Sequence, residues 1–366
     1  MPAPNPMDQI EHSREPAPAL NRRDWLKAMT AAAGLSVGSM GTSPTHPIVA
    51  ADALKPAAVE ASQTGPALIS ITLDLEMSRN FPSWETMHWD YEKGNLDEAT
   101  KKYAVAAGKV VRDRGGVIHY FCVGRVLEQE NVDWLRDLAA AGHPIGNHTY
   151  DHIYLLADKK EDLQFRFKRS PWLLRNMTVA EAIADNIQLT TTALEQRCGI
   201  ATRGFRTPGG FATGLKGRED LQKLLLGQGF KWVSSMYPSH LAAAPQQPPS
   251  AELINSVLSA QSAAQPFVYP SGLVELPMSP ISDIGAFRTG RWKLDEFVAV
   301  TKQAVEWVIE RGLTFDFLAH PSCLGVMDPE FKTVRMICDL VEKSNGRAKI
   351  VPLDDLVVRA KTPAAS

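Results

Sequence analysis

The run ALISITLDL, residues 67–75, is apolar and rich in β-branched side chains, which predicts a buried strand. Residues 95–114 follow it with apolar positions at helical spacing and stop at Gly115 and Gly116, which predicts a helix. A second strand is predicted at 117–123 and a second helix at 132–141. This order favours an α/β fold with a parallel sheet covered by helices, either open or closed into a barrel.

The same alternation continues along the chain. Thr178 and Glu181 form a capping box ahead of a helix that Gly199 ends. Further helices are predicted at 219–226, 294–310 and 329–344, the last with Asp328 as N-cap and Pro329 in its first turn. Strands are predicted near 204–205, 231–235, 273–278 and 314–319. Residues 238–265, rich in Ala, Pro, Gln and Ser, are interpreted as an insertion within a single catalytic domain at 67–366.

Composition limits the classes of function. The chain has 366 residues, of which 44% are hydrophobic and 22% charged, as in ordinary globular proteins. A net charge of −2 argues against a dedicated nucleic-acid binder. The basic cluster at 159–175 is interpreted as a solvated loop or short helix, with a patch for anionic ligands as the alternative. The 4 cysteines lack zinc-ribbon spacing, so free thiols are expected, with one disulfide as the alternative.

The N-terminal 53 residues are interpreted as a targeting segment. Arg22 and Arg23 precede a mildly apolar stretch at 28–40 that is too short and weak to span a bilayer. This pattern resembles a bacterial twin-arginine export signal, and a Pro/Ala-rich linker follows at 54–66. The resemblance implies the twin-arginine export machinery as a partner and a periplasmic or extracellular location, without a stable membrane span. A fortuitous arginine pair is the alternative.

His148 and His152 suggest half of a metal site. Four residues apart, they are predicted to share one face of a helical turn and so to reach the same ion. The alternative is a helix N-terminus with two surface histidines.

Other polar residues follow predicted strands. Asp74 and Glu76 end the first strand, Arg206 follows the fourth, and His320 follows the strand at 314–319. In parallel α/β folds the carboxyl ends of the strands meet on one rim, so these groups are expected to converge with the histidine pair.

These motifs resemble the polysaccharide deacetylase family (NodB-homology domain, carbohydrate esterase family 4) from residue 67 to the C-terminus. His-Thr-Tyr-Asp-His at 148–152 matches the second motif, Arg-Thr-Pro-Gly-Gly at 206–210 the third, and Phe-Leu-Ala-His at 317–320 loosely the fifth. The resemblance implies a deformed (β/α) barrel, and a divalent metal, usually Zn²⁺, that serves to remove N- or O-acetyl groups from glycans.

Two motifs depart from the family pattern. The first usually has two adjacent aspartates, whereas here one residue separates Asp74 from Glu76; alternation in a strand would point both to one face. The fourth lacks its aspartate near 230–235, and Asp283 is a candidate replacement from another loop. A rim carboxylate facing solvent is the alternative for Glu76.

The resemblance also implies roles for these residues. Glu76, His148 and His152 would hold the metal, which leaves an open position for a water molecule. Asp74 would act as base, oriented by Arg206, and His320 would protonate the leaving amine. The backbone N–H of Gly209 would bind the oxyanion. A loop with four ring-bearing residues is predicted to stack against sugars, with a plain packing cluster as the alternative; these are Trp84, His88, Trp89 and Tyr91.

The predicted function is therefore an exported, metal-dependent deacetylase of an acetylated glycan, with N-acetyl groups favoured over O-acetyl groups. One rival is hydrolysis of another C–N bond, in a cyclic imide or ureide, for which the site should be narrow and closed. A second rival is a non-catalytic glycan-binding protein that retains the metal.

Overall fold

Strand β1 (Ala67–Leu75) is buried along its whole length, with the bounds that the sequence predicts. The computed structural model describes residues 65–77, 93–242 and 244–360. Within these residues β1 lies in a 9-stranded sheet of order β6-β7-β5-β4-β3-β2-β1-β8, and β9 also pairs with β1. All pairs are parallel except β6 with β7. The other strands are β2 (Ile118–Cys122), β3 (Ile145–Asn147), β4 (Phe205–Phe211), β5 (Trp232–Met236), β6 (Phe267–Val268), β7 (Val274–Glu275), β8 (Thr314–Ala319) and β9 (Ala348–Ile350).

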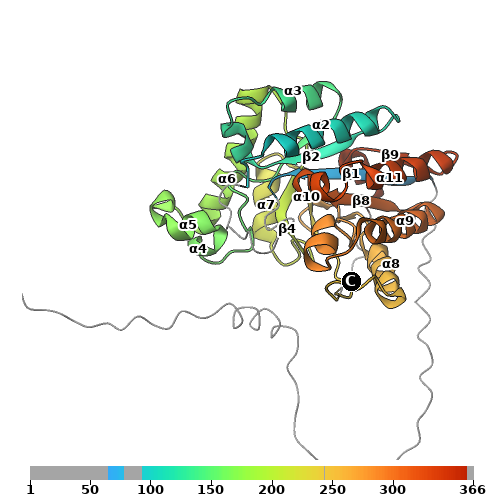
Figure 1. Ribbon diagram of the computed structural model, residues 1–366. Helices are drawn as coiled ribbons and strands as arrows, with labels where there is room; N and C mark the ends of the chain where they lie inside the picture. Colours follow the sequence, from blue (N-terminus) through green and yellow to red (C-terminus); the bar gives the residue numbers. More distant parts are fainter. Residues whose placement is uncertain (1–64, 78–92, 243, 361–366) are drawn as a thin grey trace, which may run out of the picture. The chain divides into compact units, whose positions relative to one another are not determined.

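Helices form a layer around this sheet (Figure 1). They contact one another in the order α8, α9, α11, α2, α3 and α6. The helices are α2 (Glu98–Arg112), α3 (Asp133–Ala140), α4 (Lys160–Leu163), α5 (Phe165–Arg169), α6 (Val179–Cys198), α7 (Glu219–Gly227), α8 (Ala251–Ala263), α9 (Leu294–Arg311), α10 (Pro321–Met327) and α11 (Lys332–Lys343). Helices α4 and α5 come from the basic cluster, which thus forms short helices.

Irregular contacts, in place of a strand pair, join the two ends of the sheet. After β7, the backbone N–H of Ser279 donates to the carbonyl of Asp316 in β8 at 3.1 Å, and the Asp316 N–H donates back to the Ser279 hydroxyl at 3.1 Å. The prediction of a deformed (β/α) barrel in a single catalytic domain is confirmed, and the deformation is the replacement of a full strand pair by this bridge.

Local sequence signals account for most helix ends. Thr178 and Glu181 form the predicted capping box of α6, and Gly199 ends it at φ 66°. The predicted start of the helix at 329–344 is wrong. Phe331, in a left-handed conformation, is the N-cap of α11, while the Asp328 carboxylate accepts the N–H groups of Lys332 and Thr333 from outside the helix.

The region interpreted as an insertion contains α8. This helix packs against α9, and the Gln261 side chain donates to the backbone carbonyl of Thr314 at the start of β8. The proposed domain bounds stay a prediction. None of the 4 cysteines forms a disulfide, and three are buried. No helix among the described residues is long and apolar enough to cross a membrane.

Candidate active site

The two carboxylates of the first motif meet at the end of β1. The strand ends at Leu75, and the Glu76 N–H donates to the Asp74 carbonyl at 2.9 Å, which makes a tight turn. Asp74 and Glu76 are only 4% exposed, whereas Leu73 and Leu75 pack into the hydrophobic core. Both acids face His148, as the strand alternation predicts, and the turn after Leu75 positions Glu76.

The histidine pair lies on a loop, which corrects the predicted helical turn. The chain leaves β3 at Asn147, and Thr149 and His152 take left-handed conformations with φ 57° and 55°. Side chains hold this conformation, since Asn147 Oδ1 accepts the Thr149 N–H and Thr149 Oγ1 accepts the Ile153 N–H. Backbone strain of this kind is stable only where surrounding contacts enforce it.

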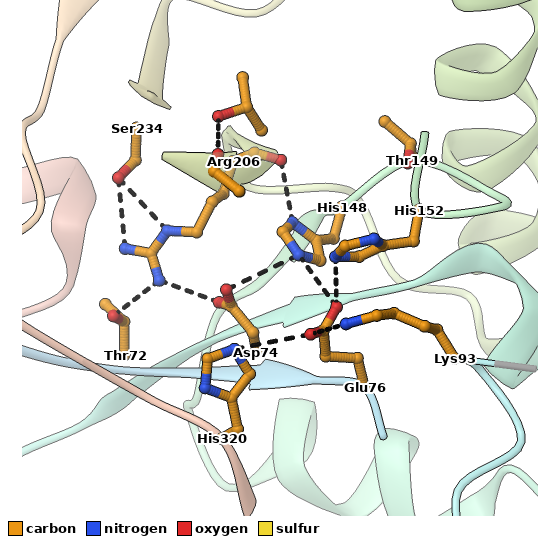
Figure 2. Close-up of polar contacts among 12 residues, drawn as sticks. Thr72, Asp74, Glu76, Lys93, His148, Thr149, His152, Arg206, Ser234 and His320 are labelled. Atoms are coloured by element: carbon orange, nitrogen blue, oxygen red, sulfur yellow. Dashed lines mark hydrogen bonds and ion pairs between the residues drawn. The ribbon is translucent and has the colours of Figure 1, made fainter. Parts of the chain in front are cut away.

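Figure 2 shows Glu76, His148 and His152 directed toward one another. Glu76 Oε2 lies 2.5 Å from His152 Nε2 and 3.6 Å from His148 Nε2, and one ligand atom from each residue lies within 4.8 Å of the others. Glu76 Oε2 is buried and makes no hydrogen bond of acceptable geometry. A buried carboxylate oxygen that faces two imidazole nitrogens fits a divalent cation.

Each histidine has a feature that suits a metal ligand. His148 Nδ1 lies 3.0 Å from the Arg206 carbonyl, so it carries the proton and leaves the Nε2 lone pair for the site. Burial lowers the pKa of His152 to about 4, although the Glu76 carboxylate raises it. His152 is therefore uncharged near neutral pH.

Lys93 is an unpredicted member of the cluster. Its Nζ lies 2.5 Å from Glu76 Oε1, on the opposite oxygen from the one that faces the imidazoles. Burial raises the pKa of Glu76, but its interactions with His152, Lys93 and His148 outweigh burial and hold this pKa well below the usual range. Glu76 is thus kept ionised.

Arg206 is fully buried and joins three strands. Its guanidinium donates to Asp74 Oδ1 at 2.9 Å, to Thr72 Oγ1 at 2.8 Å and to Asp316 Oδ2 at 2.5 Å, and it lies over the Phe121 ring at 4.3 Å. The fork geometry of arginine permits this multiple pairing, which lysine lacks. Arg206 therefore fixes the position of the Asp74 carboxylate.

The raised pKa of Asp316, a partner of Arg206, makes the hydrogen-bond network around Arg206 testable. Burial raises the pKa of Asp316 to about 6, although Arg206 and Thr72 lower it. The folded protein thus binds more protons than the unfolded chain between pH ~4 and ~6, so this residue's stabilising contribution falls as pH rises through that window. In wild type, this residue should lower the free energy of unfolding by on the order of 2 kcal/mol across that window. We expect Asp316→Asn to abolish this decrease.

The measurement is the free energy of unfolding of metal-free protein in urea, at intervals from pH 4 to pH 7. The difference in the free energy of unfolding between wild type and Asp316→Asn should change across the window from pH ~4 to ~6. A constant difference would contradict the raised pKa.

His320 pairs with Asp283, the candidate replacement for the aspartate that the fourth motif lacks. The carboxylate of Asp283 lies 2.9 Å from His320 Nδ1 through Oδ1 and accepts the His320 backbone N–H at 2.7 Å through Oδ2. The other nitrogen, Nε2, lies 3.6 Å from Glu76 Oε1. Burial lowers the pKa of His320, but the Asp283 charge outweighs it and raises the pKa above the ordinary value. Asp283 thus occupies the place proposed for it from the sequence.

These groups face a cavity of about 300 Å³. Gly209 lines it with φ 73°, a left-handed conformation that glycine adopts without strain. Tyr237, Met278 and Leu318 contribute apolar surface. The proposed sugar-stacking residues lie outside the described residues and stay a prediction, and these are Trp84, His88, Trp89 and Tyr91. The structure brings together all the other predicted residues, whose catalytic and metal-binding roles stay predictions.

Part of the chain is similar to a known protein family. Residues 94–224 match the family model described as polysaccharide deacetylase. This stretch is thus similar to polysaccharide deacetylase domains. This match includes the histidine pair and Arg206, and excludes β1 and His320. Among curated proteins, none matches this sequence.

Solved structures resemble this chain in fold. One, from Mycobacterium smegmatis and assigned by name to the polysaccharide deacetylases, has 16% identity and a TM-score of 0.53, over 86% of this chain and 99% of that one. Another so named, from Pseudomonas aeruginosa PAO1, has 14% identity and a TM-score of 0.51, over 81% and 91%. PuuE allantoinase has 15% identity and a TM-score of 0.51, over 87% and 97%.

Sequence reasoning missed Lys93 and Asp316 at this site. Asp316 gave a usable signal, because it interrupts the apolar run Phe315, Phe317 and Leu318 of a buried strand, where a charge needs a partner. Lys93 gave none, because it precedes α2 in a segment without periodicity.

Proposed function

We propose that this polysaccharide deacetylase domain is a metal-dependent hydrolase that removes acetyl groups, N-acetyl in preference to O-acetyl, from an extracytoplasmic glycan. The observation that carries the proposal is the convergence of three groups of residues on one cavity: Glu76 with the two histidines, Asp74 with Arg206, and His320 with Asp283.

Glu76, His148 and His152 would hold the metal. Two neutral imidazoles and one carboxylate favour Zn²⁺, and this ligand set leaves a coordination position open. When bound, such an ion polarises a carbonyl oxygen and lowers the pKa of water to about 7. Lys93 would stay on the far oxygen of Glu76 and keep that ligand ionised.

Asp74 and His320 divide the proton transfers. Asp74, which Arg206 holds in position, is the base that takes a proton from the attacking water. His320, which Asp283 holds in its protonated form, is the acid that donates a proton to the leaving amine. The Gly209 backbone lies on the same cavity, where its N–H can stabilise the developing oxyanion.

The test of this proposal measures bound metal and acetate release together. Purified protein is analysed for metal, then incubated with chitooligosaccharides, peptidoglycan and acetylated xylan before and after treatment with a chelator. Acetate release that the chelator abolishes and Zn²⁺ restores is expected. Stoichiometric metal without acetate from any of these substrates would reject the deacetylase.

The pairing of Asp283 with His320 predicts a shift in the pH profile. Because the Asp283 charge raises the pKa of His320, Asp283→Asn should lower it. Activity that needs protonated His320 is lost as pH rises through this pKa, so the alkaline limb should move to lower pH by about one unit. The measurement is kcat against pH for both proteins. An unchanged alkaline limb would remove His320 from the role of acid.

A second candidate is hydrolysis of a C–N bond in a small molecule such as a ureide. The observation that favours it is the cavity volume of about 300 Å³, at the lower end for small-molecule sites. Allantoin and hydantoin therefore belong in the same panel, with ring opening as the readout. The complete set of Asp74, Arg206 and His320 argues against a non-catalytic glycan-binding protein.

We also propose that the twin-arginine machinery exports the protein. Arg22 and Arg23 support this, and both lie outside the described residues. Replacement of both arginines by lysine in the bacterial host should retain the protein in the cytoplasm, as fractionation with immunoblotting would detect.

A further inference from the structure

Arg288 is a cation of the cavity that the proposed reaction does not use. It belongs to a π-helical turn (Ile284–Thr289), whose N-cap is Asp283, the partner of His320. It is half-buried and lines the same cavity as Asp74, Glu76 and His320. Among the described residues, none forms a hydrogen bond or ion pair with Arg288, although its charge acts on the nearby Cys323 thiol.

The other two permanent cations of the site differ from Arg288 in this respect. Arg206 is paired with Asp74 and Asp316, and Lys93 is paired with Glu76. A guanidinium that lines a cavity without a carboxylate partner keeps its N–H groups available for a ligand.

Charge pairing indicates the sign of the ligand charge. The other cationic groups of the site each face a carboxylate: Arg206 faces Asp74 and Asp316, Lys93 faces Glu76, and His320 faces Asp283. Arg288 is therefore the cation of this cavity that no described carboxylate neutralises. Its planar fork of N–H donors matches the two oxygens of a carboxylate.

We propose that Arg288 binds a carboxylate of the substrate, so that the site selects an anionic substrate whose carboxylate lies close to the bond that is cleaved. This inference rests on the proposed hydrolytic function and specifies its substrate class. The carboxylate can belong to an acidic sugar of a glycan or to a small acylated amino acid. Both present the same group to Arg288, and the experiment separates them.

The test uses matched ligand pairs that differ only in the carboxylate. The glycan pair is the disaccharide of N-acetylglucosamine and N-acetylmuramic acid, compared with the methyl ester of its lactyl group. The small-molecule pair is N-carbamoylglycine compared with N-carbamoylglycinamide. Dissociation constants are measured by calorimetry on Zn²⁺-loaded Asp74→Asn protein, so that binding is observed without turnover, and kcat/KM is measured on protein with Asp74 intact.

We expect the anionic member of one pair to bind about tenfold more tightly or better than its neutral partner. Arg288→Gln should reduce this preference to about one, and Arg288→Lys should restore part of it. Arg175→Gln, at an exposed arginine outside the cavity, is the matched control and should keep the preference. The pair that shows the preference identifies the source of the carboxylate.

Two results would overturn the inference. One is an equal affinity for charged and neutral members, or no measurable binding, in both pairs; the other is a preference that survives Arg288→Gln. Loss of the proposed function gives a different pattern, in which the carboxylate preference persists in binding while no substrate is turned over.

Discussion

Asp74→Asn is expected to lower kcat by about 10²- to 10⁴-fold while metal content stays that of wild type. The amide has nearly the shape of the carboxylate and can still accept from Arg206, but it cannot take a proton from water. Asp74 makes its closest contact with Arg206 at 2.9 Å, whereas its distance to His148 Nε2 is 3.6 Å, so the substitution removes the base and leaves the Glu76 and histidine group in place.

The measurements are acetate release and bound zinc on the same preparation. Asp355→Asn is the matched control, because Asp355 is an exposed aspartate that does not line the cavity. Activity of Asp74→Asn within a few-fold of wild type would show that another group takes the proton. Loss of zinc along with activity would instead place Asp74 among the metal ligands.

His148→Ala and His152→Ala should each weaken zinc binding by more than about 100-fold and abolish zinc-dependent turnover. Substitution of a group that merely orients a metal ligand already lowers metal affinity by about 10- to 100-fold. Removal of a ligand itself should lower the affinity further. Each substitution also leaves the buried Glu76 carboxylate with one fewer partner.

Competition with a zinc-binding dye measures this affinity without reference to activity. His240→Ala is the control, since this histidine lies outside the cavity and its ring bonds to the adjacent Leu241 carbonyl. If either variant holds zinc as tightly as wild type, that histidine is not a ligand.

Sequence alone predicted the elements whose signals are local. The bounds of β1 follow from an uninterrupted apolar, β-branched run, and the start of α6 follows from the side-chain exchange between Thr178 and Glu181. Convergence of Asp74, His148, Arg206 and His320 was predictable because parallel strands end on one rim.

The details that failed depend on contacts made elsewhere in the fold. Four-residue spacing placed His148 and His152 on a helix, but Asn147 and Thr149 side chains hold that segment as a loop with two left-handed residues. Aspartate is a common N-cap residue, which favoured Asp328, yet the chain reaches a helical conformation only after Phe331. In both places side-chain hydrogen bonds override a pattern that was read from spacing.

Long-range partners were the least predictable part of the site. The contact of Asp283 with His320 joins residues 37 positions apart and could only be suspected from the sequence. Arg288 has no sequence signal, because its significance lies in the absence of a partner among the described residues that surround it.

Strand β1 has a consequence for the synthesis of the protein. Its start pairs with β9 at 348–350, and its opposite edge pairs with β8 at 314–319. A ribosome therefore releases β1, with Asp74 and Glu76 at its end, long before two of its three partner strands exist. Contacts so distant in sequence form slowly and leave apolar strand edges exposed in the meantime. The nascent chain must consequently be kept from aggregating until its last residues emerge, and a truncation before residue 314 should yield insoluble protein.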